Sequence, residues 1–279
     1  MSGSSKPGPD VSDLLRRQID ELDLFATIAR NGLGWGQAAL VYEEVVTRMS
    51  KYRGRSYTEE ELEHGRTRAA TVQAFADEQE SKGFPYLYNL LAIRIWTILE
   101  NLVDESAARR VRDPKIMMTL KGLEGLSVPL LQFLSAGEDA RTEFIVDTIK
   151  QATKSRLKIG VGRFESLLEA VGLGGEVPDS IKRTILELSE IRNVLVHRDG
   201  VCDRRIVERC PWLTLNAGQQ VAVSEEQFRL FRLLPGWYIC EMHRRAGDVA
   251  ADLVDLLNEA VQKLEEAFKK NAPDRTSRG

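Results

Sequence analysis

Cysteine and histidine are scarce in this 279-residue chain, which contains three of each. The cysteines, Cys202, Cys210 and Cys240, are odd in number, and no two of them have the close spacing of a zinc-binding pair. This pattern argues against a disulfide scaffold and against a zinc cluster built on cysteine pairs. We therefore expect reduced, packed thiols, as in a cytoplasmic protein, and neither a metal nor a cofactor.

The chain also lacks an excess of one charge and a long apolar run. Its 39 basic and 42 acidic residues leave a net charge of −3, so any RNA binding would have to rely on local basic clusters. The longest apolar stretch, residues 86–103, contains Asn89, Arg94, Glu100 and Asn101 and is too polar to span a membrane. The first ten residues contain no apolar segment typical of a secretory signal. We expect a cytoplasmic protein with no membrane partner.

Helical periodicity is what the sequence does contain. Hydrophobic residues make up 43% of the chain, enough for a core, and they recur at three- and four-residue steps over most of its length. Thr58 and Ser224, with Glu61 and Gln227 three residues later, have the form of capping boxes that open helices. The sequence therefore predicts an all-α protein, built as a multi-helix bundle.

Composition divides the chain into four parts. Residues 1–9 are rich in glycine, serine and proline and are expected to be disordered, and 272–279 should form a flexible tail. A break at Ser81-Lys82-Gly83-Phe84-Pro85 separates an N-terminal helical region, 10–83, from a larger helical domain, 84–271. Within that domain, two short alternating runs around an Asn-Ala-Gly turn predict a small β-hairpin over 210–224.

The segment from 181 to 200, IKRTILELSEIRNVLVHRDG, is the most informative stretch. Its apolar residues predict a helix with one buried stripe. Pro178 suits the first turn, and an oxygen of Asp179 or Ser180 is expected to cap it. Asp199 and Gly200 should end the helix, with the glycine in the left-handed conformation.

Arg192 and His197 lie near the end of this helix. At about 100° per residue their side chains are roughly 140° apart, whereas Asn193 and His197 share a face. A phosphate held by Arg192 and His197 would lie across a cleft, with a second helix, from the same chain or from a second one, supplying the other half. The alternative is that Arg192 is solvated and that His197 interacts with the helix C-terminus.

The surrounding sequence points to a family. ELSEIRNVLVHRDG, followed by VCDRR and CPWL, resembles the signature helix of the HEPN superfamily, whose members carry Arg, a polar neighbour, and His four to six positions further on. IRIWTILE, residues 93–100, resembles an upstream helix of some bacterial members. The similarity extends over about residues 84 to 268. It implies a HEPN-like helical bundle that forms a homodimer with a composite site at the interface.

The resemblance also implies an activity. HEPN ribonucleases cleave RNA without a metal, through attack of the 2′-hydroxyl that leaves a 2′,3′-cyclic phosphate, and many act as toxins or in phage defence. By this resemblance His197 would be the acid/base, Arg192 the phosphate clamp, and Asn193 an orienting or phosphate-contacting group. Glu100 is a candidate for orienting Arg192 or His197. The partners expected are RNA, a second copy and a regulatory protein such as an antitoxin.

Two basic clusters are candidates for further RNA contacts, with a solvated helix face as the alternative for each. The first contains Arg198, Arg204, Arg205 and Arg209, and the second contains Arg229, Arg232, Arg244 and Arg245. Two alternative functions also stay open. One is a non-catalytic HEPN-like dimer that binds nucleotide, RNA or a protein, and the other is an all-α scaffold in which the Arg-His spacing is accidental.

Overall fold

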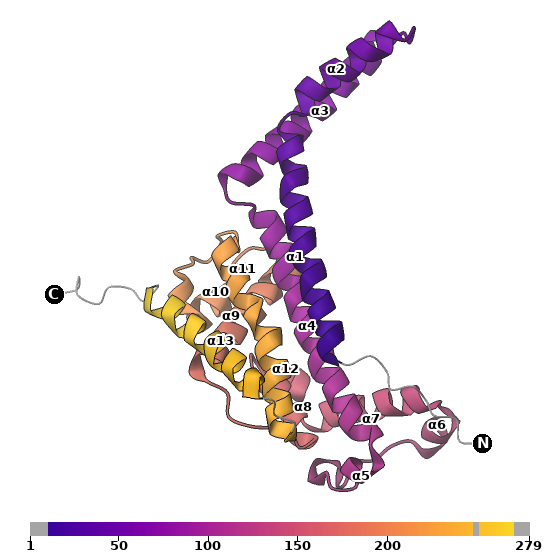
Figure 1. Ribbon diagram of the computed structural model, residues 1–279, viewed down its shortest axis with the longest axis vertical. Coiled ribbons are helices and arrows are strands. Elements are labelled where there is room, and N and C mark those ends of the chain that lie inside the picture. The colour runs from indigo at the N-terminus through magenta and orange to yellow at the C-terminus, as the bar shows by residue number, and fades with distance from the viewer. Residues whose placement is uncertain (1–10, 248–250, 271–279) are drawn as a thin grey trace, which may run out of the picture.

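The computed structural model describes residues 11–247 and 251–270, and in this part of the chain every regular element is a helix (Figure 1). The all-α prediction is confirmed. Helix α1 (Val11–Gly36) lies alongside α4 (Pro85–Arg112), while α2 (Ala39–Tyr52) and α3 (Glu59–Ser81) pair and project beyond the rest of the molecule. We call α2 and α3 the arm, and the remainder the body.

Helix α4 is the centre of the body. It packs against α1, α7, α8, α9, α11 and α12, and one hydrophobic core unites them. Trp96 is almost fully buried, and its ring lies 5.1 Å from that of Phe164 in α8. Burying a large apolar side chain stabilises a fold by about 1.5–3 kcal/mol. The buried face of α4 therefore supplies much of the driving force for assembling the body.

The expected boundary near residue 83 falls at a sharp turn, where Gly83 and Phe84 both have positive φ. Helix α1 nevertheless belongs to the body, because Leu22 and Ala26 lie in the same core as α4. The segments 1–9 and 272–279, expected to be disordered and flexible, lie outside the described residues.

Between α4 and α9 the helices are short. Gly122, Gly125 and Pro129 divide the region 117–134 into separate short elements. A side chain at Gly122 would collide with the backbone of Ala170, since its Cβ would lie 2.4 Å from the carbonyl oxygen. The elements here are α5 (Pro114–Met117), η1 (Lys121–Leu123), α6 (Leu130–Ser135), α7 (Glu138–Ala152), η2 (Ser155–Leu157) and α8 (Gly162–Ala170).

Helix α9 (Asp179–His197) corresponds to the signature segment, and its apolar stripe packs in the core. Its end is as predicted: Gly200 has a φ of +78°, and its amide donates to the Val194 carbonyl at 3.1 Å. The predicted side-chain cap is wrong. Pro178 occupies the N-cap position, and the Asp179 carboxylate pairs with Lys182 at 3.0 Å instead.

The predicted hairpin over 210–224 is also wrong. Pro211–Leu213 coil into a 3-10 turn, because Pro211 has no amide proton for a ladder and Thr214 takes a positive φ. The later half of the segment pairs back with the residues after α9, through one antiparallel bridge between Val201 and Gln220. The helices of this region are α10 (Arg204–Arg209), α11 (Glu225–Phe231), α12 (Leu233–Ala246) and α13 (Ala251–Lys270).

Both capping boxes are confirmed. The Thr58 hydroxyl accepts from the Glu61 amide at the start of α3, and the Ser224 hydroxyl accepts from the Gln227 amide at the start of α11. Over the described ranges, no helix combines the length and apolar character needed to cross a membrane.

Candidate functional site

The C-terminal end of α9 brings three predicted residues into contact. Arg192 Nη1 lies 3.4 Å from His197 Nε2 and 3.5 Å from Asn193 Oδ1. The long arginine side chain thus spans the angle that separates it from His197 on the helix. Arg192 is half-buried, and its Nε has no hydrogen-bond partner, whereas His197 is exposed.

His197 and Asn193 face a cleft of about 460 Å³, and Arg192 approaches His197 from the neighbouring face of α9. The cleft is bounded by α9, α10 and the segment between η2 and α8. Four cations line it, together with two carboxylates. These charged residues are Lys158, Arg163, Arg198 and Arg205, and Glu190 and Asp203.

Lys158 and Arg163 were not predicted from the sequence. They reach the cleft because the turn between them packs directly on α9. Gly160 has a φ of +54°, and a Cβ there would lie 3.4 Å from the Leu186 Cα. The Gly160-Val161-Gly162 sequence hinted at such a turn, but without a preceding strand it does not match a nucleotide-binding loop.

Glu100 ion-pairs with Arg163, with 2.6 Å between its Oε1 and the arginine Nη2. The Arg163 guanidinium also lies over the Trp96 ring, 5.8 Å from its centroid. Glu100 therefore acts on the cleft indirectly, by positioning Arg163, which lines it. It also lines a neighbouring cavity of about 330 Å³ with Asp104 and Lys150.

The first basic cluster is largely engaged by carboxylates. Glu190, almost fully buried in α9, binds Arg205 at 3.0 Å and Arg209 at 2.8 Å. A buried carboxylate needs such charge-assisted bonds, so these two arginines fix α10 against α9. Arg198 lies 3.6 Å from Asp203, and Arg204 is exposed.

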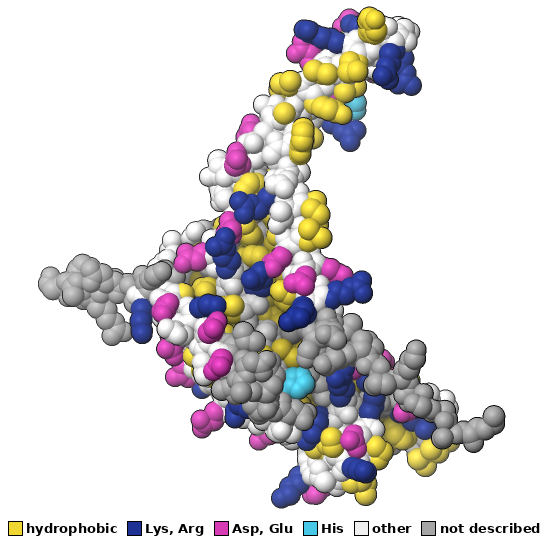
Figure 2. Space-filling view, in the orientation of Figure 1, with side chains coloured by type: hydrophobic (Ala, Val, Ile, Leu, Met, Phe, Trp, Pro, Cys, Tyr) yellow, Lys and Arg dark blue, Asp and Glu magenta, His cyan; other side chains and the backbone are white. Residues whose placement is uncertain are grey.

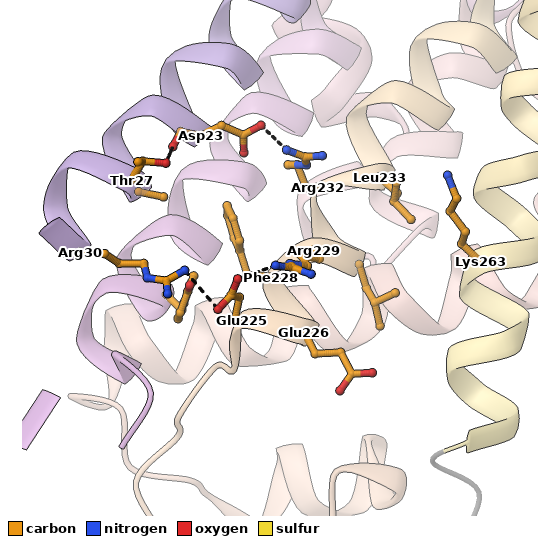
Figure 3. A pocket seen from close by; sticks show the side chains of 13 residues that line it. Asp23, Thr27, Arg30, Glu225, Glu226, Phe228, Arg229, Arg232, Leu233 and Lys263 are labelled. Carbon is orange, nitrogen blue, oxygen red and sulfur yellow. Dashed lines mark hydrogen bonds and ion pairs between the residues drawn. The ribbon is translucent and has the colours of Figure 1, made fainter. Parts of the chain in front are cut away.

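The second basic cluster is split between two places. Arg229 and Arg232 line a cavity of about 700 Å³ where α1 meets α11, α12 and α13 (Figure 3). There Glu225 lies between Arg229, at 2.7 Å, and Arg30, at 3.3 Å, while Arg232 pairs with Asp23. The pairs made by Arg30 and Asp23 join α1 to the region of α11 and α12.

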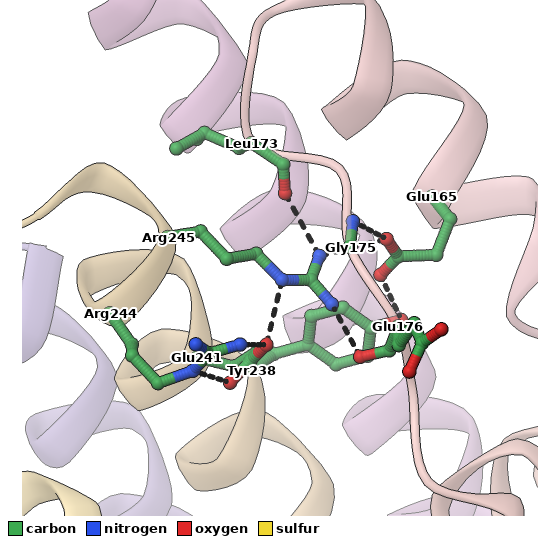
Figure 4. Close-up of polar contacts among 8 residues, drawn as sticks. All are labelled: Glu165, Leu173, Gly175, Glu176, Tyr238, Glu241, Arg244 and Arg245. Carbon is green, nitrogen blue, oxygen red and sulfur yellow. Dashed lines mark hydrogen bonds and ion pairs between the residues drawn. The ribbon is translucent and has the colours of Figure 1, made fainter.

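Arg244 and Arg245 belong to a separate network (Figure 4). Arg245 bonds to Glu165 and Glu241, both at 2.8 Å, and donates to the carbonyls of Leu173 and Glu176. The network thus joins α8 and α12 to the loop that leads into α9. Burial raises the pKa of Glu165, although Arg245 opposes this shift.

No family model, curated protein or solved structure matches this chain. The chemistry of the cleft must therefore be judged from its own side chains. Across residues 11–247 and 251–270, no group of three or more His, Cys, Asp or Glu side chains is arranged to hold a metal ion. The cleft instead offers one imidazole, one amide and several guanidinium and ammonium groups, a set suited to phosphate esters.

Proposed function

We propose that this protein is a metal-independent endoribonuclease of the HEPN type, with Arg192 and His197 as its reacting pair. The observation that carries the proposal is the 3.4 Å approach of the Arg192 Nη1 to the His197 Nε2 at the mouth of a cation-lined cleft. A structural role for His197 would not require an arginine at this distance, because an exposed histidine can be solvated by water.

The role of His197 Nε2 in this contact depends on which ring nitrogen carries the proton. Arginine has only donors, so the contact is a hydrogen bond when Nε2 carries no proton and accepts. When the Arg192 guanidinium turns from His197 to the phosphate, the lone pair of His197 Nε2 is free to take the proton of a ribose 2′-hydroxyl. The 2′-oxygen then attacks the adjacent phosphorus, and the bond to the 5′-oxygen breaks. The products are a 2′,3′-cyclic phosphate and a 5′-hydroxyl.

Arg192 stabilises the charge that develops on the phosphoryl oxygens, because its planar fork matches their geometry. Asn193, 3.5 Å from the same guanidinium nitrogen, orients it. Lys158 and Arg198, both exposed in the cleft, contact neighbouring phosphates and set the register of the RNA.

The leaving 5′-oxygen needs a proton from a second acid, and one chain supplies one histidine on α9. We infer that a second copy brings its own α9 to the first and completes the site. Exposed apolar side chains support this arrangement, because Leu157 and Ile159 line the cleft and Val196 directly precedes His197. Apolar side chains around a polar centre are typical of an interface.

The test is incubation of mixed RNA with the purified protein in EDTA, comparing wild type with Arg192→Ala and His197→Ala. Wild type should cut, and both variants should lose cleavage by at least a hundredfold while retaining their fold. His64→Ala, an exposed histidine of the arm, is the matched control and should cut like wild type. RNA binding without cleavage by wild type would favour the non-catalytic module instead, and equal cleavage by all variants would refute the pair.

A further inference from the structure

In helix α2 of the arm, the apolar side faces solvent and the more polar side faces α3. Its more polar side, with Glu43, Thr47 and Ser50, is half-buried, and Glu43 lies against α3, where its carboxylate occupies the space that a side chain at Gly65 would need. No residue of α2 is buried. Its apolar side chains face solvent and are between 38% and 94% exposed, and they form what we call the α2 face: Val41, Tyr42, Val45, Val46, Met49 and Tyr52.

These six residues form one continuous surface. At about 100° per residue they occupy an arc of about 140° of the helix, and no charged residue interrupts it. Figure 2 shows hydrophobic side chains along the arm, and Trp35, at the end of α1, is exposed as well. A solitary amphipathic helix would bury this side, so its exposure indicates a surface that is covered in the working protein.

The size of the α2 face matches a protein interface. At roughly 100 Å² of exposed surface for each of six large side chains, the face offers roughly 600 Å², close to the ~800 Å² that one partner contributes to a standard interface. A monomer rarely exposes an apolar patch of more than a few hundred square ångströms. The exposed side chain of Trp35, at the end of α1, adds to this area and brings it nearer to ~800 Å².

We propose that the α2 face binds the α2 face of a second copy, with the two helices antiparallel about a two-fold axis near Val46. Val46 lies close to the middle of the face, so the apolar residues of each chain cover those of the other. Glu44 and Arg48, which pair within the chain at 2.5 Å, lie two residues before and two residues after this axis, so each is level with its opposite charge on the second copy. The two exposed pairs can therefore exchange partners at the edge of the interface, an arrangement that is self-complementary about a two-fold axis.

The charges of α2 also favour a second copy of the chain over a membrane surface as the partner of the α2 face. Interfacial helices are rich in lysine and arginine on their polar side. Helix α2 instead carries Glu43 and Glu44 against Arg48 and Lys51, so it has no net attraction to anionic lipid. The proposed contact lies at the tip of the arm, far from α9 in Figure 1, and holds whether or not the chain cleaves RNA.

The test is the molar mass of the full-length protein by size-exclusion chromatography with light scattering. Val45→Glu/Met49→Glu should halve the mass of the wild-type assembly, because it places carboxylates in the middle of the interface. Leu131→Glu, at a leucine of α6 that is 84% exposed, is the control and should leave the mass unchanged. Circular dichroism checks that each variant is folded.

Exchange of the charges of Glu44 and Arg48 is a second test, and it leaves the apolar residues of the arm unchanged. Glu44→Arg should weaken the dimer several-fold, since it sets two arginines against each other, and Glu44→Arg/Arg48→Glu should restore it. Val46→Cys should also form a disulfide across the axis under mild oxidation, because the natural cysteines are buried. A monomeric wild type, an unchanged mass in Val45→Glu/Met49→Glu, or failure of the second exchange to restore association would overturn the proposal.

Discussion

Arg245 should be one of the most sensitive positions outside the core, and Arg245→Met tests how the loop before α9 is held. The Arg245 side chain is only 4% exposed and bonds to two carboxylates, those of Glu165 and Glu241, and to two backbone carbonyls. Methionine fills similar space but leaves all four acceptors without this donor. Breaking a buried ion pair from one side costs about 3–5 kcal/mol. That is a large part of the ~5–15 kcal/mol by which a domain is stable.

The loss should depend on pH. Burial raises the pKa of Glu165 even with Arg245 beside it, so removal of the cation must raise this pKa further. At neutral pH the variant either keeps an unpaired buried carboxylate or spends free energy to protonate it. As the pH falls through the raised pKa toward the ordinary value of 4.5, the carboxyl becomes neutral in both states. The difference in stability between wild type and variant should therefore shrink in acid.

Urea denaturation followed by circular dichroism measures this difference, and the neighbouring arginine is the control. Arg244 also binds Glu241, but its side chain is 49% exposed. Arg244→Met should lose about 1 kcal/mol or less. The reasoning fails if Arg245→Met is no less stable than Arg244→Met, or if its deficit is the same at neutral and acid pH.

Three further outcomes are expected. Burial raises the pKa of Glu187, while bonds from Trp212 and Gln227 oppose it, so the wild type should gain stability relative to Glu187→Gln as the pH falls through the raised pKa. A stability difference that stays constant with pH in urea titrations would contradict this expectation. Asn89→Ala should lose about 1–3 kcal/mol in thermal or urea unfolding, because buried backbone groups of 221 and 223 lose their partner; a smaller loss would show that water replaces it. Burial raises the pKa of Cys210 to about 12, so a thiol reagent at mildly alkaline pH should label it only after unfolding, and rapid labelling of the native protein would refute its burial.

Local patterns predicted the parts of the fold that local physics controls. The capping boxes at Thr58 and Ser224 depend on residues three apart, and both form. The stripe of α9 depends on helical spacing, and it lies in the core. The cap of α9 failed because Asp179, once inside the first turn, pairs with Lys182 rather than with the free amides. The hairpin failed because its later residues found a partner elsewhere in the chain, at Val201.

The candidate site shows the same limit. Asn193 and His197 lie one helical turn apart, so their shared face could be predicted from the sequence, whereas the approach of Arg192 to His197 depends on how the long arginine side chain folds over. Lys158 and Arg163 precede Arg192 by about thirty residues and reach the cleft through the packing of Gly160 on α9. The engagement of Arg205 and Arg209 by Glu190 was equally hidden, because sequence alone does not show which arginine meets a buried carboxylate.

Analysis of the RNA ends tests the central claim most directly. Wild-type protein in EDTA should leave a 2′,3′-cyclic phosphate and a 5′-hydroxyl, His197→Ala should leave neither, and a 2′-deoxy substitution at the cleaved position should block the cut. A 5′-phosphate product would contradict the account, because it would mean that water rather than the 2′-hydroxyl attacks the phosphorus. Undiminished cleavage by His197→Ala would contradict it equally, since the base would then lie elsewhere.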